Sequence, residues 1–218
     1  MRTYTIAHTG RPPELKGVWQ GDSWGDVEPL TITEFRPEGS DHKPVTQCKL
    51  LYDTSFLYGL FRVDDFYVRS VHTHYHAAVC EDSCVEFFVQ PEASPGYLNF
   101  EFNAGGTIFC DYNIPTQVGR DKYPVSQKDA ATIQIFHSQP DVVDPEHVGP
   151  LDWTLEFAIP LSLINRIAGS IDNPAGCTWR ANFYKCGDKT SHPHWGAWSP
   201  VPEVNFHLPD SFGQIRFT

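Results

Sequence analysis

Apolar and polar side chains alternate with a period of two along most of this chain, which favours β-strands over helices. Successive side chains of a strand point to opposite faces of a sheet, so each such segment predicts a strand with one apolar face. Gly, Pro, Asp and Asn residues separate most of the segments, as expected of turns. The predicted strands are residues 46–52, 56–64, 83–90, 97–103, 107–112, 132–137, 153–159, 178–185 and 213–217.

One segment has the features of a helix. Residues 160–167 begin with Pro160 and are followed by Gly169, residue types that are common at the start and just past the end of a helix. Many short strands with one short helix predict an all-β fold, an antiparallel β-sandwich of the immunoglobulin-like or jelly-roll-like kind. The sequence has no internal repeat or linker, so we expect a single domain over residues 1–218.

The charge of the chain excludes several kinds of partner. Its formal net charge is −11, which argues against binding to nucleic acid or to an anionic membrane surface. No apolar run is long enough for a membrane span. Residues 1–8 lack the hydrophobic stretch of a secretory signal, so we expect a soluble, cytoplasmic protein unless a leader was removed. Nothing in the sequence indicates the oligomeric state.

The six cysteines are irregularly spaced along the chain. A domain of this size does not need disulfide bonds for stability. We therefore expect most of them to be reduced thiols that pack as small apolar side chains.

The alternation also sorts side chains between the two faces of the predicted sheets. One set is apolar and should lie between the sheets: Phe87, Phe100, Phe102, Leu155, Phe157 and Phe183. The opposite faces carry a polar set: Glu86, Glu101, Glu156, Arg180, Asn182 and Tyr184. Two interpretations remain open for the polar set. It is either a solvated outer face with weak ion pairs, or the floor of a binding site for a ligand rich in hydroxyl groups.

Several blocks of the sequence, taken in order, resemble the family 9 carbohydrate-binding modules. The blocks are residues 82–88 (DSCVEFF), 97–103 (YLNFEFN), 153–160 (WTLEFAIP), 179–183 (WRANF), 198–200 (WSP) and 206–217 (FHLPDSFGQIRF). The resemblance extends from about residue 15 to the C-terminus. It implies a β-sandwich that binds carbohydrate, in agreement with the strands predicted above.

In that family, two tryptophans enclose a sugar ring, and a carboxylate and amides bind its hydroxyl groups. The resemblance places Glu86 at the sugar-binding glutamate and Phe206 at one stacking tryptophan. Val79 stands at the other tryptophan and cannot stack on a sugar. Glu101 replaces an arginine of the family, and Tyr184 replaces a glutamine. The resemblance thus implies a retained scaffold with an altered pocket.

From these observations we expect non-catalytic glycan binding through a polar concave sheet face and aromatic stacking. Trp195 joins the candidates because it follows a loop rich in Gly and Pro, where an exposed aromatic side chain is expected. The expected carbohydrate-binding residues are Glu86, Glu101, Arg180, Asn182, Tyr184, Trp195 and Phe206.

An enzyme is the alternative. Glu86, Glu101 and Glu156 on one face could serve a glycoside hydrolase, since two suitably spaced carboxyl groups can cleave a glycosidic bond. A neighbouring His or Tyr could serve a polysaccharide lyase as base or acid. The sequence contains no nucleophile elbow, phosphate-binding loop or zinc-protease motif.

The metal content stays open at this point, and no cofactor is certain. The resemblance implies a structural Ca²⁺, which prefers oxygen ligands. Candidate ligands are Asp64, Asp65, Asp82, Asp141, Asp144, Glu146 and Asp152. His72, His74 and His76 would extend over more than about 10 Å of a strand, so at most two of them could reach one transition metal.

Overall fold

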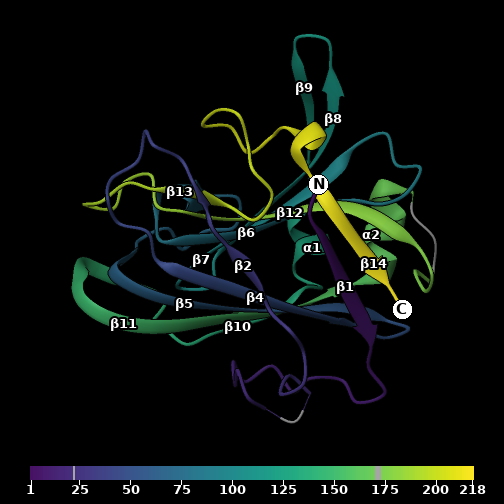
Figure 1. Cartoon of the computed structure of the whole chain (residues 1–218), viewed down its shortest axis with the longest axis horizontal. Helices are drawn as coiled ribbons and strands as arrows, with labels where there is room; N and C mark the ends of the chain where they lie inside the picture. The colour runs from purple at the N-terminus through teal and green to yellow at the C-terminus, as the bar shows by residue number, and fades with distance from the viewer. Residues whose placement is uncertain (22, 170–172) are drawn as a thin grey trace.

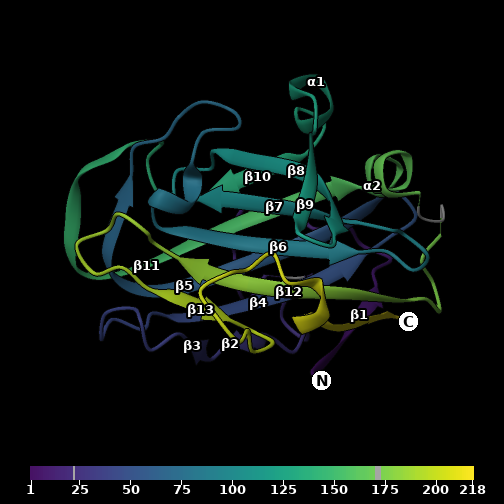
Figure 2. The same ribbon diagram turned by 90° about the horizontal axis from the view of Figure 1, so that it is seen from above.

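The computed structural model describes residues 1–21, 23–169 and 173–218, and they form two facing β-sheets (Figure 1). The order of the first sheet is β1 (Thr3–His8), β14 (Gly213–Phe217), β12 (Thr178–Cys186), β6 (Cys84–Gln90), β7 (Tyr97–Asn103), β8 (Ile108–Thr116) and β9 (Gly119–Pro124). The short strand β13 (Trp195–Ala197) also pairs with β12, and β3 (Glu34–Phe35) pairs with β13. In Figure 2, β6, β7, β8 and β12 lie side by side.

The second sheet contains β10 (Gln134–His137), β11 (Val143–Pro160), β5 (Phe56–Ser70) and β4 (Val45–Tyr52), in this order, with β2 (Leu30–Ile32) along the edge of β4. The strand β1 joins the two sheets. Its residues 3–6 pair with β14 and its last two residues pair with β4, both in parallel. All other strand pairs of the described residues are antiparallel, so the predicted antiparallel sandwich is confirmed, with β1 as the parallel exception.

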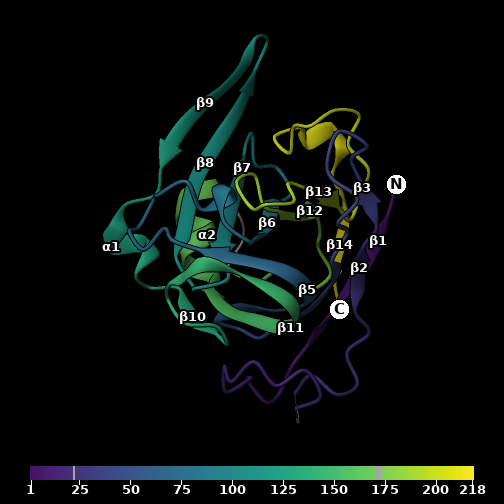
Figure 3. The same ribbon diagram turned by 90° about the vertical axis from the view of Figure 1, so that its left-hand side faces the viewer.

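The core lies between the two sheets (Figure 3). All six residues predicted there are 0 % exposed: Phe87, Phe100, Phe102, Leu155, Phe157 and Phe183. Phe157 of the second sheet stacks against Phe87 and Phe102 of the first, with ring centroids 5.9 Å and 5.4 Å apart. These contacts confirm that the period-two alternation identified the core-facing side of each strand.

The predicted helix is present as α2 (Leu161–Ala168). It ends at Gly169, whose φ of 66° lies in the left-handed region that favours glycine. Its buried side chains Leu161, Leu163 and Ile164 cover one end of the core. Among the described residues, no helix is long and apolar enough to cross a membrane.

Several short elements were not predicted. The one-turn helix α1 (Gln127–Ala130) is capped by Ser126, whose hydroxyl oxygen accepts a hydrogen bond from the Asp129 backbone N–H. The 3₁₀ turns η1 (Val79–Glu81) and η2 (Pro209–Ser211) have three residues each. The strands β1, β2, β3, β9 and β13 were missed as well. The strands β2, β3 and β13 have only two or three residues, too few for a period to show, whereas β1 and β9 have six residues that are mostly exposed and so lack an apolar face.

A polar cluster interrupts the apolar core near the end of β12. The ammonium Nζ of Lys185 lies 2.8 Å from His194 Nε2 and 3.7 Å from Asp65 Oδ2. Asp65 also accepts hydrogen bonds from His42 Nε2 at 2.7 Å and Trp153 Nε1 at 3.2 Å. The side chains of Asp65 and Lys185 are completely buried, so each depends on the other for charge compensation.

Neutral His194 makes the stability of the fold depend on pH. Its Nδ1 carries a proton and donates it to the His192 carbonyl oxygen, so only Nε2 could take a second proton, and this would break the hydrogen bond that Nε2 accepts from Lys185. Burial and the Lys185 charge lower the pKa of His194 from 6.5 to about 3, while Asp65 opposes and His42 adds to this shift. The unfolded chain therefore binds more protons, and this contribution to stability is present above pH 6.5 and is lost as the pH falls towards 3.

On acidification, we expect His194 alone to lower the free energy of unfolding by up to about 1.4 kcal/mol per pH unit. Urea unfolding of the wild type and of His194→Gln at several pH values would measure it. Glutamine keeps an acceptor for Lys185 but does not titrate, so its slope against pH should be shallower. Equal slopes for the two proteins would refute this role for His194. His207, with a pKa also lowered to about 3 by burial, contributes equally to both slopes.

Candidate functional site

Two buried glutamates lie opposite each other on the outer face of the first sheet. Pairing of β6 with β7 places Glu86 opposite Glu101, and pairing of β6 with β12 places Glu86 opposite Tyr184. Glu86 is 2 % exposed and Glu101 is 7 % exposed. They form the floor of a cavity of about 300 Å³, here called the acidic cavity, which is lined by Cys80, Glu86, Glu101, Cys186, Asp188, Trp195, Val204, Asn205, Phe206 and His207.

Aromatic side chains form the walls of the acidic cavity. The Phe206 ring stacks on Tyr184, with centroids 4.0 Å apart and an interplanar angle of 10°. The Tyr184 hydroxyl donates to the Phe206 carbonyl oxygen at 3.0 Å, which holds this loop against the sheet. Trp195 lies on β13 and donates from Nε1 to Asp188 Oδ1 at 2.8 Å. The cavity thus combines carboxylates with two partly exposed aromatic rings, Phe206 and Trp195.

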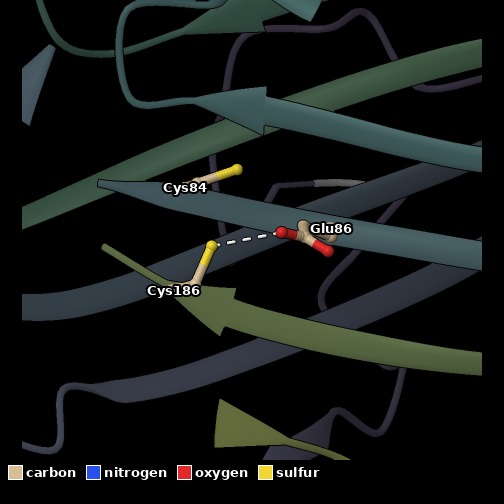
Figure 4. Close-up of side chains that lie close together, drawn as sticks. All are labelled: Cys84, Glu86 and Cys186. Carbon is tan, nitrogen blue, oxygen red and sulfur yellow. Dashed lines mark hydrogen bonds between the residues drawn. The ribbon is translucent and has the colours of Figure 1, made fainter. Parts of the chain in front are cut away.

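Burial makes the carboxyl groups of the acidic cavity weaker acids than usual. It raises the pKa of Glu86 well above its ordinary value, and the neighbouring Glu101 adds to the rise. Burial also raises the pKa of Glu101 to about 7, although Asn99 donates to its Oε1 at 2.7 Å. The pKa of Asp188 is raised by burial as well. One Glu86 oxygen accepts a hydrogen bond from the Cys186 thiol at 3.1 Å (Figure 4).

The structure brings together four of the seven predicted binding residues. Glu86, Glu101, Trp195 and Phe206 line the acidic cavity. Tyr184 lies behind Phe206, completely buried, so it supports the wall rather than facing the cavity.

The remaining two predicted residues do not line the cavity. Asn182 is 0 % exposed, donates to the Ser199 carbonyl oxygen at 2.9 Å and accepts from the Ser199 N–H at 2.8 Å. Arg180 donates to the Pro209 carbonyl oxygen. Both side chains connect β12 to the segment that precedes β14, so the expected common floor with Asn182 is not formed. The alternation along the strand correctly predicted that both side chains lie on the outer face of the sheet, but neighbouring loops cover this part of the face.

Glu156 lies on the other sheet, which corrects the expectation that it shares a face with Glu86 and Glu101. It belongs to β11, and its two carboxylate oxygens accept from Trp24 Nε1 at 2.8 Å and from the Gly17 N–H at 2.7 Å. A larger cavity, of about 390 Å³, borders Glu156 beneath the N-terminal segment. There the carboxylate already holds that segment in place, so the acidic cavity is the better candidate for binding.

Sequence reasoning missed six of the ten residues that line the acidic cavity. Cys80, Asp188, Asn205 and His207 lie in segments without strand periodicity, so no sequence pattern placed them. A different residue supplies the aromatic ring that the family has at the position of Val79. Val79 is completely buried, whereas Trp195, from a segment far along the chain, supplies a second aromatic wall beside the cavity.

Metal-ligating side chains converge at one place in the described part of the chain. Cys84, Glu86 and Cys186 offer ligand atoms that all lie within 4.8 Å of one another. The carboxylates of Asp65 and Asp82 instead accept hydrogen bonds from nitrogen donors, including His42 and Arg69. No other group of three or more acidic, imidazole or thiol side chains with ligand atoms this close occurs in residues 1–21, 23–169 and 173–218. The expectation of Ca²⁺ therefore stays a prediction, without a carboxylate cluster to support it.

Comparisons with known proteins identify similar sequences and folds. The sequence model described as carbohydrate-binding family 9 matches residues 26–217. No curated protein matches the chain. Among solved structures, a proposed carbohydrate-binding protein from Bacteroides uniformis ATCC 8492 is 27% identical, with a TM-score of 0.87 over 100% of this chain and 99% of that chain.

Two further structures show a carbohydrate binding module of family 9 from Caldicellulosiruptor kristjanssonii. The complex with glucose is 13% identical and covers 100% of this chain and 96% of that chain. The complex with cellotriose is 14% identical and covers 99% and 93%, respectively. Both have a TM-score of 0.68. At these identities the likeness shows a shared fold.

Proposed function

Since the chain belongs to carbohydrate-binding family 9, we propose that it binds a glycan in the acidic cavity without converting it. The observation that carries this proposal is the pair Glu86 and Glu101 beside the rings of Phe206 and Trp195 in one cavity. Sugars present hydroxyl groups at their edges and C–H groups on their faces. Carboxylate oxygens accept hydrogen bonds from the hydroxyl groups, and aromatic rings pack on the C–H face.

The size of the acidic cavity supports a small buried portion of the ligand. Its volume of about 300 Å³ lies at the lower end of the range of ligand sites. This favours a monosaccharide or the end of a longer glycan over an internal segment buried on all sides. Glucose and cellotriose are the first probes to test, because the structures from Caldicellulosiruptor kristjanssonii contain them. A glycan array then extends the search to other sugars.

We expect Phe206→Ala to weaken glycan binding by roughly 5- to 150-fold, by analogy with the 1–3 kcal/mol measured for a base stacked on an aromatic side chain. Titration calorimetry with the best ligand from the array would measure the change. Phe66→Ala is the matched control, because Phe66 is exposed on β5 of the other sheet and does not line the cavity. Equal affinities of Phe206→Ala and the wild type would contradict the proposed stacking.

Glu101→Gln tests the carboxylate contribution and separates binding from catalysis. In a binding protein it should weaken the complex, while Glu92→Gln on an exposed loop removes the same charge without effect. Product analysis of each ligand should find no conversion by either protein. If the wild type cleaves a glycan and Glu101→Gln still binds it but no longer cleaves it, the chain is an enzyme and the non-catalytic proposal is wrong.

A further inference from the structure

Two thiols and a carboxyl group meet at the floor of the acidic cavity. Cys84 on β6 and Cys186 on β12 are directly opposite each other in the strand register, and Glu86 lies two residues from Cys84 on the same face. Their ligand atoms all lie within 4.8 Å of one another, and the Cys186 thiol is 3.1 Å from Glu86 Oε1 (Figure 4).

These distances suit a tetrahedral metal ion. Zinc binds thiolate sulfur at about 2.3 Å and carboxylate oxygen at about 2.0–2.2 Å, which places neighbouring ligand atoms roughly 3.5–3.8 Å apart. The Cys186 sulfur and the Glu86 oxygen are 3.1 Å apart, and all three ligand atoms lie within 4.8 Å of one another. Modest side-chain rotations would therefore bring them to the spacing of a tetrahedral zinc site. The three side chains are 0–2 % exposed and come from two paired strands, which limits their freedom. Such a set of ligands needs little rearrangement when the ion binds.

The surroundings of the three side chains also favour a cation. The acidic cavity adds the carboxyl groups of Glu101 and Asp188 and the thiol of Cys80, and its lining contains no lysine or arginine. Lys185, the neighbour of Cys186 in the sequence, instead contacts Asp65 and His194 between the sheets. A divalent ion would stabilise the deprotonated forms of these carboxyl groups and thiols, which no lysine or arginine of the lining stabilises.

We propose that Cys84, Cys186 and Glu86 bind one Zn²⁺ ion, with the fourth coordination position facing the acidic cavity. Thiolate ligands select zinc over the hard cations calcium and magnesium. On binding, both thiols and the Glu86 carboxyl group release their protons to solvent, and sulfur–zinc and oxygen–zinc bonds replace the S–H and O–H bonds. Glu86 and Cys186 both line the acidic cavity, so water or a cavity ligand can reach the fourth position. This site does not depend on glycan binding.

Metal analysis of the whole chain tests the proposal. The protein is stripped with a chelator, titrated with zinc against a chromophoric competitor, and analysed for metal content. We expect one zinc ion per chain. The Cys84→Ser/Cys186→Ser variant should bind zinc at least about 100-fold more weakly, which is the upper limit of the loss seen when only an outer partner of a ligand is removed. Cys177→Ser is the matched control, because Cys177 directly precedes β12, whose last residue is Cys186, and about 3.3 Å per residue places the two cysteines roughly 30 Å apart.

Cobalt provides a readout that does not depend on how the variants fold. Bound to the wild type, Co²⁺ should show the absorption of a tetrahedral ion together with thiolate-to-cobalt charge-transfer bands. An octahedral spectrum without these bands would overturn the proposal. So would less than one equivalent of zinc in the wild type, undiminished zinc binding by the folded double variant, or a Cys84–Cys186 disulfide found by mass spectrometry in freshly purified protein.

Discussion

Asp65→Ala should lower the free energy of unfolding by about 3–5 kcal/mol, as expected when one partner of a buried ion pair is removed. Lys185 would keep a buried ammonium group 3.7 Å from the lost carboxylate. The hydrogen bonds from His42 and Trp153 would be lost as well. Burial alone would raise the pKa of Asp65, but the Lys185 charge and these hydrogen bonds outweigh it and hold this pKa well below its usual range. Urea unfolding at neutral pH would measure the change.

Asp64→Ala is the matched control for this measurement. Asp64 precedes Asp65 on β5, but its partly exposed carboxylate pairs with Arg62 at the surface. Such surface pairs contribute about 0–1 kcal/mol. A double variant, Asp65→Leu/Lys185→Met, should recover much of the stability, because no unpaired charge remains buried. If Asp65→Ala is no less stable than Asp64→Ala, the charge pair between the sheets does not have the importance assigned to it here.

Phe157→Ala should destabilise the protein by about 3–5 kcal/mol, the cost of removing a large ring from a well-packed core. Phe157 is 0 % exposed, and its ring contacts those of Phe61, Phe87 and Phe102 from both sheets. Gly59 on β5 leaves the space that the ring fills, since a Cβ at Gly59 would lie 2.1 Å from Phe157 Cζ. Thermal and urea unfolding would measure the loss.

The close contact between Gly59 and Phe157 allows a sharper test. Gly59→Ala alone should be strongly destabilising, because the new methyl group collides with the Phe157 ring. In the Phe157→Ala background the same methyl group enters the vacated space, so Gly59→Ala should cost much less or even stabilise the protein. Equal effects of Gly59→Ala in the two backgrounds would show that the ring does not occupy the position described.

Local alternation predicted the fold class and the composition of the core. Phe87, Phe100 and Phe183 are buried between the sheets, as the alternation predicted. Side chains alternate between the two faces in every β-strand, so this prediction needs only the local sequence. The helix α2 was equally predictable, since Pro160 and Gly169 flank a segment of eight residues with one apolar face, which is long enough for a short helix. These features required no knowledge of which segments pair with one another.

The composition of the acidic cavity could be predicted only in part. The period-two alternation placed Glu86 and Glu101 on the outer faces of their strands, and the family resemblance added Phe206. Glu156 also lies on the outer face of its strand, but that strand belongs to the opposite sheet. Asn182 lies on the same outer face as Glu86 but is covered by the loop at Ser199. Period-two patterns determine which side chains share a face of one strand. They contain no information about which strands become neighbours or which loops fold over them.

The sequence by itself determined the strands that form the core, their buried faces and the family. The tertiary structure decided the membership of the site, because pairing of β6 with β7 and β12 joins residues about 15 and 100 positions apart. Asp188 and Trp195 reach the cavity through the strand pairing and loops near the end of β12. The register of those pairs depends on the packing of the whole core, so the meeting of Cys84, Glu86 and Cys186 follows from long-range contacts rather than from any local pattern.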